Sequence, residues 1–118
     1  MKLFKSLTTS EKRKIREAVI PELEQYRILR SLENINDAQE TFLRRMEKAL
    51  EGLPSIEKLV ITKRYTDNDS DYVTDYQMYN IYMNPPVCVV TYSSIRDRAM
   101  FKIALFLEID TGIDLKVC

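Results

Sequence analysis

Apolar residues recur at helical spacing along most of the chain, and polar or proline-containing breaks divide this pattern into five segments. Thr8 and Glu11 have the spacing of a capping box, which predicts that a first helix begins here. Pro21 interrupts this segment, and because proline removes a helical hydrogen bond, we expect one bent helix or two short ones. The apolar residues of the segment follow every three or four positions: Ile15, Val19, Leu23, Tyr26 and Leu29.

A second helix is predicted to begin at Asn36 or Asp37 and to end near Leu50, since Gly52 and Pro54 follow directly. Its apolar face repeats every four residues: Ala38, Phe42, Met46 and Leu50. This regular spacing predicts a helix with one buried side.

Ser55 is positioned to cap a third helix, which ends with the basic pair Lys63 and Arg64. An acidic run follows at residues 67–71 and has the Asp-x-Asp-x-Asp spacing of a calcium loop. It lacks the glycine and the distal glutamate that such a loop needs. We therefore interpret the run as a solvated connection.

Thr74 and Gln77 have capping-box spacing at the start of a short fourth helix, which the Asn-Pro-Pro sequence at 84–86 must end. A fifth helix is predicted to begin at Val89 or Thr91 and to end near residues 110–112. Its later part is apolar nearly all round, so it either packs against the N-terminal helices or forms a homodimer contact. The expected buried stripe comprises Ile95, Ala99, Ile103 and Phe106.

These segments predict an all-α fold, a small bundle of about five helices with a C-terminal helix-turn-helix. Residues 1–52 form an N-terminal helical segment, which we interpret as a candidate partner or dimerisation surface. Residues 53–112 form the helix-turn-helix region, and residues 113–118 are a short tail.

The amino-acid composition is typical of a helical protein and indicates where in the cell the protein is expected. The chain has 118 residues, of which 45% are hydrophobic and 31% charged, with only two glycines. No apolar run approaches the length that crosses a bilayer, and the polar N-terminus does not resemble a secretory signal. Cys88 and Cys118 have neither metal-binding nor redox spacing, as expected of free thiols in a reducing compartment. We therefore expect a cytoplasmic protein with no membrane association.

Several chemical functions lack the residues they need. Histidine, the commonest general base and neutral metal ligand, is absent from the sequence. The sequence also contains no glycine-rich phosphate loop and no nucleophile beside a base. We therefore expect no enzyme activity, no metal and no cofactor.

A short capped helix, a break and a longer helix are typical of a DNA-binding helix-turn-helix. The first helix braces the second, whose N-terminal turns enter the major groove with polar side chains. Residues 91–98 offer hydroxyl, phenol and guanidinium groups within two turns. The candidate DNA contacts are Thr91, Tyr92, Ser93, Ser94, Arg96 and Arg98, with Lys102, Lys63 and Arg64 as candidate phosphate contacts.

The residues at 58–65, 73–80 and 91–104 carry a resemblance to a known family. Their most specific parts are Arg64-Tyr65, Thr74-Asp75-Tyr76 and the run Ile95-Arg96-x-x-Ala99-x-x-Lys102-x-Ala104. Together they resemble the ArpU family of small regulators from Gram-positive phages and prophages. The resemblance implies a late-gene activator with a helix-turn-helix similar to region four of sigma factors. It also implies double-stranded DNA as the partner, and host RNA polymerase as a second one, in the cytoplasm of a bacterial host.

Two features favour a different function, a helical module that binds another regulator rather than DNA. The formal net charge is zero, whereas phosphate neutralisation supplies most non-specific DNA affinity. Residues 1–52 carry eleven Lys/Arg against nine Asp/Glu, residues 53–87 three against five, and residues 88–118 four of each. Ser93 and Ser94 also occupy positions where family members usually carry a basic residue. Salt dependence of DNA binding separates the two hypotheses.

Overall fold

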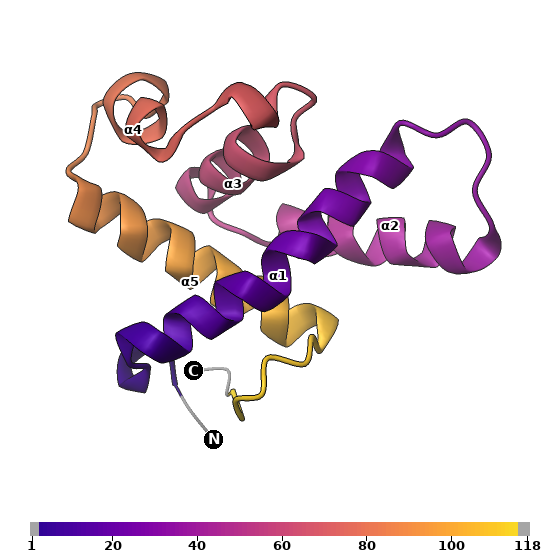
Figure 1. The fold of residues 1–118 in the computed structure, drawn as a ribbon, viewed down its shortest axis with the longest axis horizontal. Coiled ribbons are helices and arrows are strands. Elements are labelled where there is room, and N and C mark those ends of the chain that lie inside the picture. The colour runs from indigo at the N-terminus through magenta and orange to yellow at the C-terminus, as the bar shows by residue number, and fades with distance from the viewer. Residues whose placement is uncertain (1–2, 116–118) are drawn as a thin grey trace.

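Five α-helices, joined by short 3-10 and π-helical turns, make up the chain in a computed structural model that describes residues 3–115 (Figure 1). The predicted all-α bundle is confirmed. The elements are η1 (Phe4–Ser6), α1 (Thr9–Arg30), α2 (Asp37–Glu51), α3 (Ser55–Ile61), η2 (Thr62–Thr66), η3 (Ser70–Tyr72), α4 (Asp75–Gln77), η4 (Met78–Tyr82) and α5 (Val89–Leu107).

Capping boxes begin three of the helices, and two of them were predicted in full. The Thr8 and Thr74 hydroxyls accept hydrogen bonds from the backbone N–H of Glu11 and Gln77. Asn36 caps α2 in the same way with Gln39. Ser55, in contrast, is the first residue of α3 and not its cap, which is Pro54 and provides no side-chain hydrogen bond.

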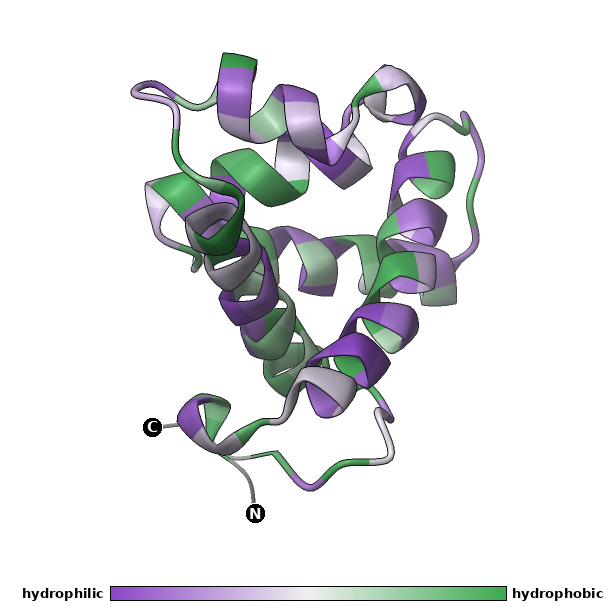
Figure 2. Ribbon diagram, turned by 60° about the vertical axis from the view of Figure 1, so that its left-hand side comes forward, coloured by the Kyte–Doolittle hydropathy of each residue, from purple (hydrophilic) through white to green (hydrophobic). Residues whose placement is uncertain are grey.

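Helix α1 runs through Pro21 without a break, so the alternative of two short helices is wrong. Pro21 lies on the exposed side of the helix, as does Glu17, whose carbonyl loses the helical hydrogen bond and can be hydrated there. The predicted apolar stripe of α1 is confirmed, because Ile15, Val19, Leu23, Tyr26 and Leu29 are all buried. Hydrophobic and hydrophilic bands alternate along α1 and α2 (Figure 2), as in other amphipathic helices.

One hydrophobic core joins the N-terminal helices to α5. Helices α1 and α5 cross near the centre of the molecule, with α3 and α4 above the crossing (Figure 1). The core residues come from α1, α2, α3 and α5, and include Val19, Met46, Ile61, Met100 and Ile103. Residues 1–52 therefore share a core with the helix-turn-helix region.

A smaller core holds the helix-turn-helix itself together. It comprises Val60, Val73, Met78, Met83 and Tyr92, which come from α3, the segment before α4, η4 and α5. This cluster fixes the short α4–η4 helix against the start of α5.

The buried surface of α5 is wider than the predicted stripe. Ala99 and Ile103 are buried as expected, but Phe106 remains 50% exposed. Met100, Phe101 and Ala104 are buried instead, because α5 packs against α1, α2 and α3 together. The apolar later part of α5 thus contacts the N-terminal helices, as one of the two interpretations expected.

No helix within residues 3–115 combines the length and the apolar character that crossing a lipid bilayer would require.

Candidate nucleic-acid interface

The first turns of α5 expose the small polar residues that the sequence predicted there. Thr91 and Ser94 are exposed and Ser93 is partly exposed. Val90 beside them is 74% exposed. The N-cap residue Cys88 contacts the Thr91 hydroxyl at 3.2 Å, and this hydrogen bond lowers the pKa of the Cys88 thiol.

Tyr92, one of the predicted DNA contacts, points into the protein, where DNA does not reach its side chain. Its side chain has no exposed surface, and its hydroxyl donates a 2.7 Å hydrogen bond to the carboxylate of Asp75. Burial, together with that hydrogen bond, raises the pKa of Tyr92 well above its usual value. Helical periodicity explains the result, since Tyr92 precedes Ala99 by seven residues, about two turns, and therefore shares its buried side.

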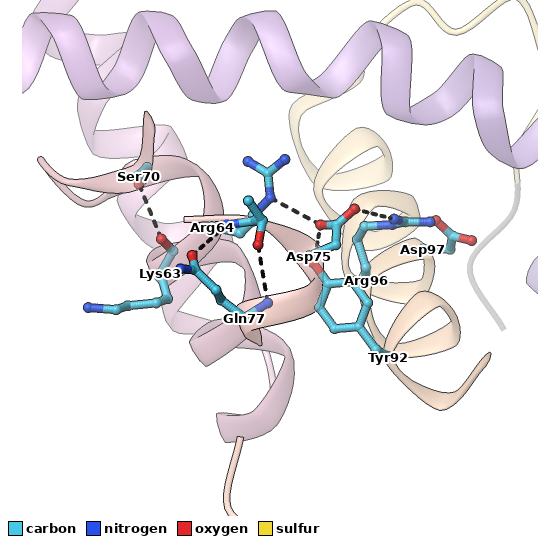
Figure 3. Close-up of polar contacts among 9 residues, drawn as sticks. Lys63, Arg64, Ser70, Asp75, Gln77, Tyr92, Arg96 and Asp97 are labelled. Carbon is cyan, nitrogen blue, oxygen red and sulfur yellow. Dashed lines mark hydrogen bonds and ion pairs between the residues drawn. The ribbon is translucent and has the colours of Figure 1, made fainter. Parts of the chain in front are cut away.

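Arg96 is held inside the helix-turn-helix by two carboxylates (Figure 3). Its guanidinium lies 3.2 Å from Asp97 and 3.6 Å from Asp75, and only 14% of its side chain is exposed. Burial alone would lower the pKa of Arg96, but the carboxylates of Asp97 and Asp75 raise it above its usual value. A DNA phosphate would have to compete with both acids for this guanidinium.

The three candidate phosphate contacts are also paired within the protein. The Arg64 guanidinium donates to Asp75 at 3.0 Å, and Lys63 lies 3.7 Å from Asp69. Lys102 donates to Glu57 at 3.0 Å, and the Glu57 side chain is only 7% exposed. Removing Lys102 would leave a buried carboxylate without its cation, so this lysine serves the packing of α3 against α5.

Asp75, at the start of α4, is the centre of these contacts. Arg64 from η2 and Arg96 from α5 approach its carboxylate from two sides, and the Tyr92 hydroxyl joins them (Figure 3). Three parts of the helix-turn-helix region, η2, α4 and α5, are therefore tied to one carboxylate. The basic residues of the predicted site thus mostly hold the unit together.

Arg98 is the one arginine among the predicted DNA contacts that is exposed. It lies beside a basic region that the sequence analysis did not identify. Its guanidinium lies 4.7 Å from the centre of the Phe4 ring. The Lys12 ammonium lies 5.0 Å from the same ring. Cations from α5 and from α1 are thereby held on one aromatic side chain.

Helix α1 begins beside the start of α5. An ion pair of 2.7 Å between Arg16 and Asp97 joins the two helices. A cleft of about 430 Å³ separates their first turns, and it is lined by Thr9, Lys12, Arg16, Val89, Val90, Ser93, Ser94 and Asp97. Hydroxyl groups of α5 thus share a cleft with cations of α1.

We define the basic surface as the cations around this cleft that have no ion-pair partner within residues 3–115. They are Lys12 and Arg98, which meet at the Phe4 ring, and Arg13, which follows Thr9 by one helical turn. The nearly balanced charge of residues 1–52 as a whole does not reveal these cations. The first 16 residues alone carry six Lys/Arg and one Glu, so a shorter window of sequence would have found this region.

Within residues 3–115, no three His, Cys, Asp or Glu side chains come close enough to hold a metal ion. In the acidic run, Asp69 pairs with Lys63 and Asp71 pairs with Arg27. Those two carboxylates are therefore engaged with cations of the protein.

No family model matches the chain, and no curated protein or solved structure is significantly similar to it.

Proposed function

We propose that the protein binds double-stranded DNA and regulates transcription. The start of α5 enters the major groove, and the basic surface contacts the adjoining phosphates. The observation that carries this proposal is the position of the α1 cations beside the exposed hydroxyl groups of α5.

Phosphate attraction depends on where the charges lie rather than on their sum. The basic surface places three cations that form no ion pair within residues 3–115 beside the first turns of α1 and α5, although the formal net charge is zero. In the proposed complex, Lys12 and Arg98, which both contact the Phe4 ring, lie over the DNA backbone. Their contacts position the protein but do not read sequence.

Base recognition falls to the first turn and a half of α5. Thr91, Ser93 and Ser94 can donate to or accept from base edges in the major groove. The exposed Val90 side chain fits the methyl group of thymine, which only the major groove displays. The proposed reading surface therefore excludes Tyr92 and Arg96.

The resemblance to the ArpU family adds the biological setting to this proposal. In that setting the protein is a phage-encoded activator of late genes in the cytoplasm of a bacterial host, and it also contacts host RNA polymerase.

The dependence of DNA affinity on salt tests the proposal. A labelled 30-base-pair duplex of random sequence is titrated with protein at several salt concentrations, and binding is followed by fluorescence anisotropy. The double variant Lys12→Ala/Arg13→Ala should lower the slope of log affinity against log salt by about 2. Lys48→Ala/Lys58→Ala is the matched control, because both lysines are exposed and lie on α2 and α3, outside the basic surface. Equal slopes for the two double variants, or no binding at low salt, would contradict the proposal.

Selection from a random duplex library tests base recognition separately. Thr91→Ala and Ser94→Ala should relax the selected sequence at single positions, each by about 1–3 kcal/mol of discrimination. Library selection that returns no preferred sequence would leave the protein a non-specific DNA binder.

A helical module that binds another protein is the second candidate function, and one observation favours it. An apolar pocket of about 440 Å³ lies between α3 and the turn before α5. Ile56 and Leu59 on its α3 side are 46% and 38% exposed. An absence of DNA binding at low salt would favour this second candidate.

A further inference from the structure

A groove of about 580 Å³ lies between α1, α2 and the end of α5. Its apolar lining consists of Ala18, Pro21, Phe42, Leu107 and Ile109. A groove of this volume can hold several side chains of a partner and is too large for a single ion. The groove is formed by residues that take no part in the basic surface.

Four carboxylates surround this apolar lining, and one cation accompanies them. The acids are Glu17, Glu22, Glu108 and Asp110, and the cation is Arg45. None of the five forms an ion pair with another described residue. The C-terminus of α5 adds the negative end of a helix dipole at the same place. The groove therefore attracts positive charge.

Glu108 occupies a backbone position that ordinarily favours glycine. It caps the C-terminus of α5 with φ of 53°, in the left-handed region. A carboxylate is thus held beside the groove at a helix end where a cationic side chain would be more favourable.

We propose that this groove binds a basic amphipathic helix of a partner protein. Such a helix places apolar side chains on the lining and Lys or Arg side chains against the four carboxylates, as in other complexes of a helix with a hydrophobic groove. DNA is repelled by the same carboxylates, so the groove and the basic surface take different partners. Among the described residues of a second copy, the basic helix α1 is not suitable, because its apolar stripe is buried in the core.

A synthetic amphipathic helix tests the proposal without knowledge of the natural partner. The probe is a labelled peptide of Leu and Lys in heptad spacing, and a peptide with Glu in place of every Lys is the charge control. We expect the Lys peptide to bind the full-length protein and the Glu peptide not to bind. Glu22→Gln/Glu108→Gln should weaken the Lys peptide about fivefold, since two exposed charge pairs are lost.

The matched control is Glu33→Gln/Glu47→Gln, which removes the same charge from carboxylates that line a different hollow near the α1–α2 connection. It should change the affinity by less than about twofold. Amide shifts in a protein NMR titration locate the peptide, and those of Ala18, Phe42 and Ile109 should move most. Circular dichroism checks that each variant is folded.

Three outcomes would overturn the proposal. Equal weakening by the two double variants would mean that the peptide senses only overall charge. Equal binding of the Glu peptide would mean that the carboxylates play no part. Self-association of the protein that Glu22→Gln/Glu108→Gln abolishes would assign the groove to a second copy. DNA binding is measured separately, so none of these outcomes bears on the proposed function.

Discussion

Single carboxylates decide much of the arrangement in the second half of this protein. The carboxylate of Asp75 pairs with Arg64 and Arg96 and accepts a hydrogen bond from the Tyr92 hydroxyl. The carboxylate of Asp97 pairs with both Arg96 and Arg16 of α1. Each of these basic residues is a reasonable DNA contact when only the sequence is known. Their pairing in the structure moves the candidate interface to the exposed hydroxyl groups of α5 and to cations that form no ion pair within residues 3–115.

Tyr92→Phe tests whether the buried phenol contributes to stability. The pKa of Tyr92 is raised in the folded state above the ordinary value of 10.0. Its contribution is therefore complete below pH 10 and is lost as the pH rises further, because the unfolded chain gives up the proton first. We expect the free energy of unfolding of the wild type to fall as the pH rises above about 10, and to fall less in Tyr92→Phe.

Urea denaturation at a series of pH values measures this effect. Tyr76→Phe is the control, because Tyr76 is 65% exposed. At neutral pH, Tyr92→Phe should also lower the free energy of unfolding by about 1–2 kcal/mol, since a hydrogen bond to a carboxylate is lost. The same pH dependence in the wild type and in Tyr92→Phe would show that the phenol titrates as it does in water.

Side-chain hydrogen bonds between residues three positions apart determine where three of the helices begin. Thr8, Asn36 and Thr74 each have an acceptor side chain three residues later, and each forms a capping box. Three residues after Ser55 comes Lys58, whose side chain cannot accept a hydrogen bond. Ser55 also follows Pro54, which has no N–H that a capping side chain could accept from. The failure of the Ser55 prediction therefore has a local cause.

Pro21→Ala tests how α1 accommodates its proline. The substitution supplies an N–H for the helix and removes the steric contact with the preceding turn. Because the unfolded chain also gains freedom, we expect a net increase of about 2 kcal/mol in the free energy of unfolding. Thermal and urea denaturation measure it, with Pro54→Ala outside the helices as the control. A loss of stability would show that α1 needs the local conformation imposed by Pro21 to pack on α5.

At the scale of the whole molecule, the N-terminal helices and the helix-turn-helix depend on each other. Arg16 pairs with Asp97, Arg27 pairs with Asp71, and Arg30 donates to the carbonyl of Thr66. These contacts surround the core that α1, α2, α3 and α5 share. The division at residue 52 therefore separates parts of one core.

The fragment comprising residues 53–118 should not fold by itself. It lacks the α1 and α2 side of the core, so the apolar side chains of α5 would face water. Circular dichroism should show low helicity and no cooperative thermal transition, and addition of a 1–52 peptide should restore both. Cooperative unfolding of the fragment alone would show instead that the second, smaller core suffices.

The sequence by itself determined the helices, their capped starts and their apolar stripes, because these depend on residues three or four positions apart. It also located the exposed start of α5. Only the tertiary structure decided which cations are free, because Arg64, Arg96 and Lys102 meet acids that are 11, 21 and 45 residues away in the chain. Tertiary packing also brought the basic start of α1 to the start of α5, and this contact between distant segments defines the proposed DNA-binding surface.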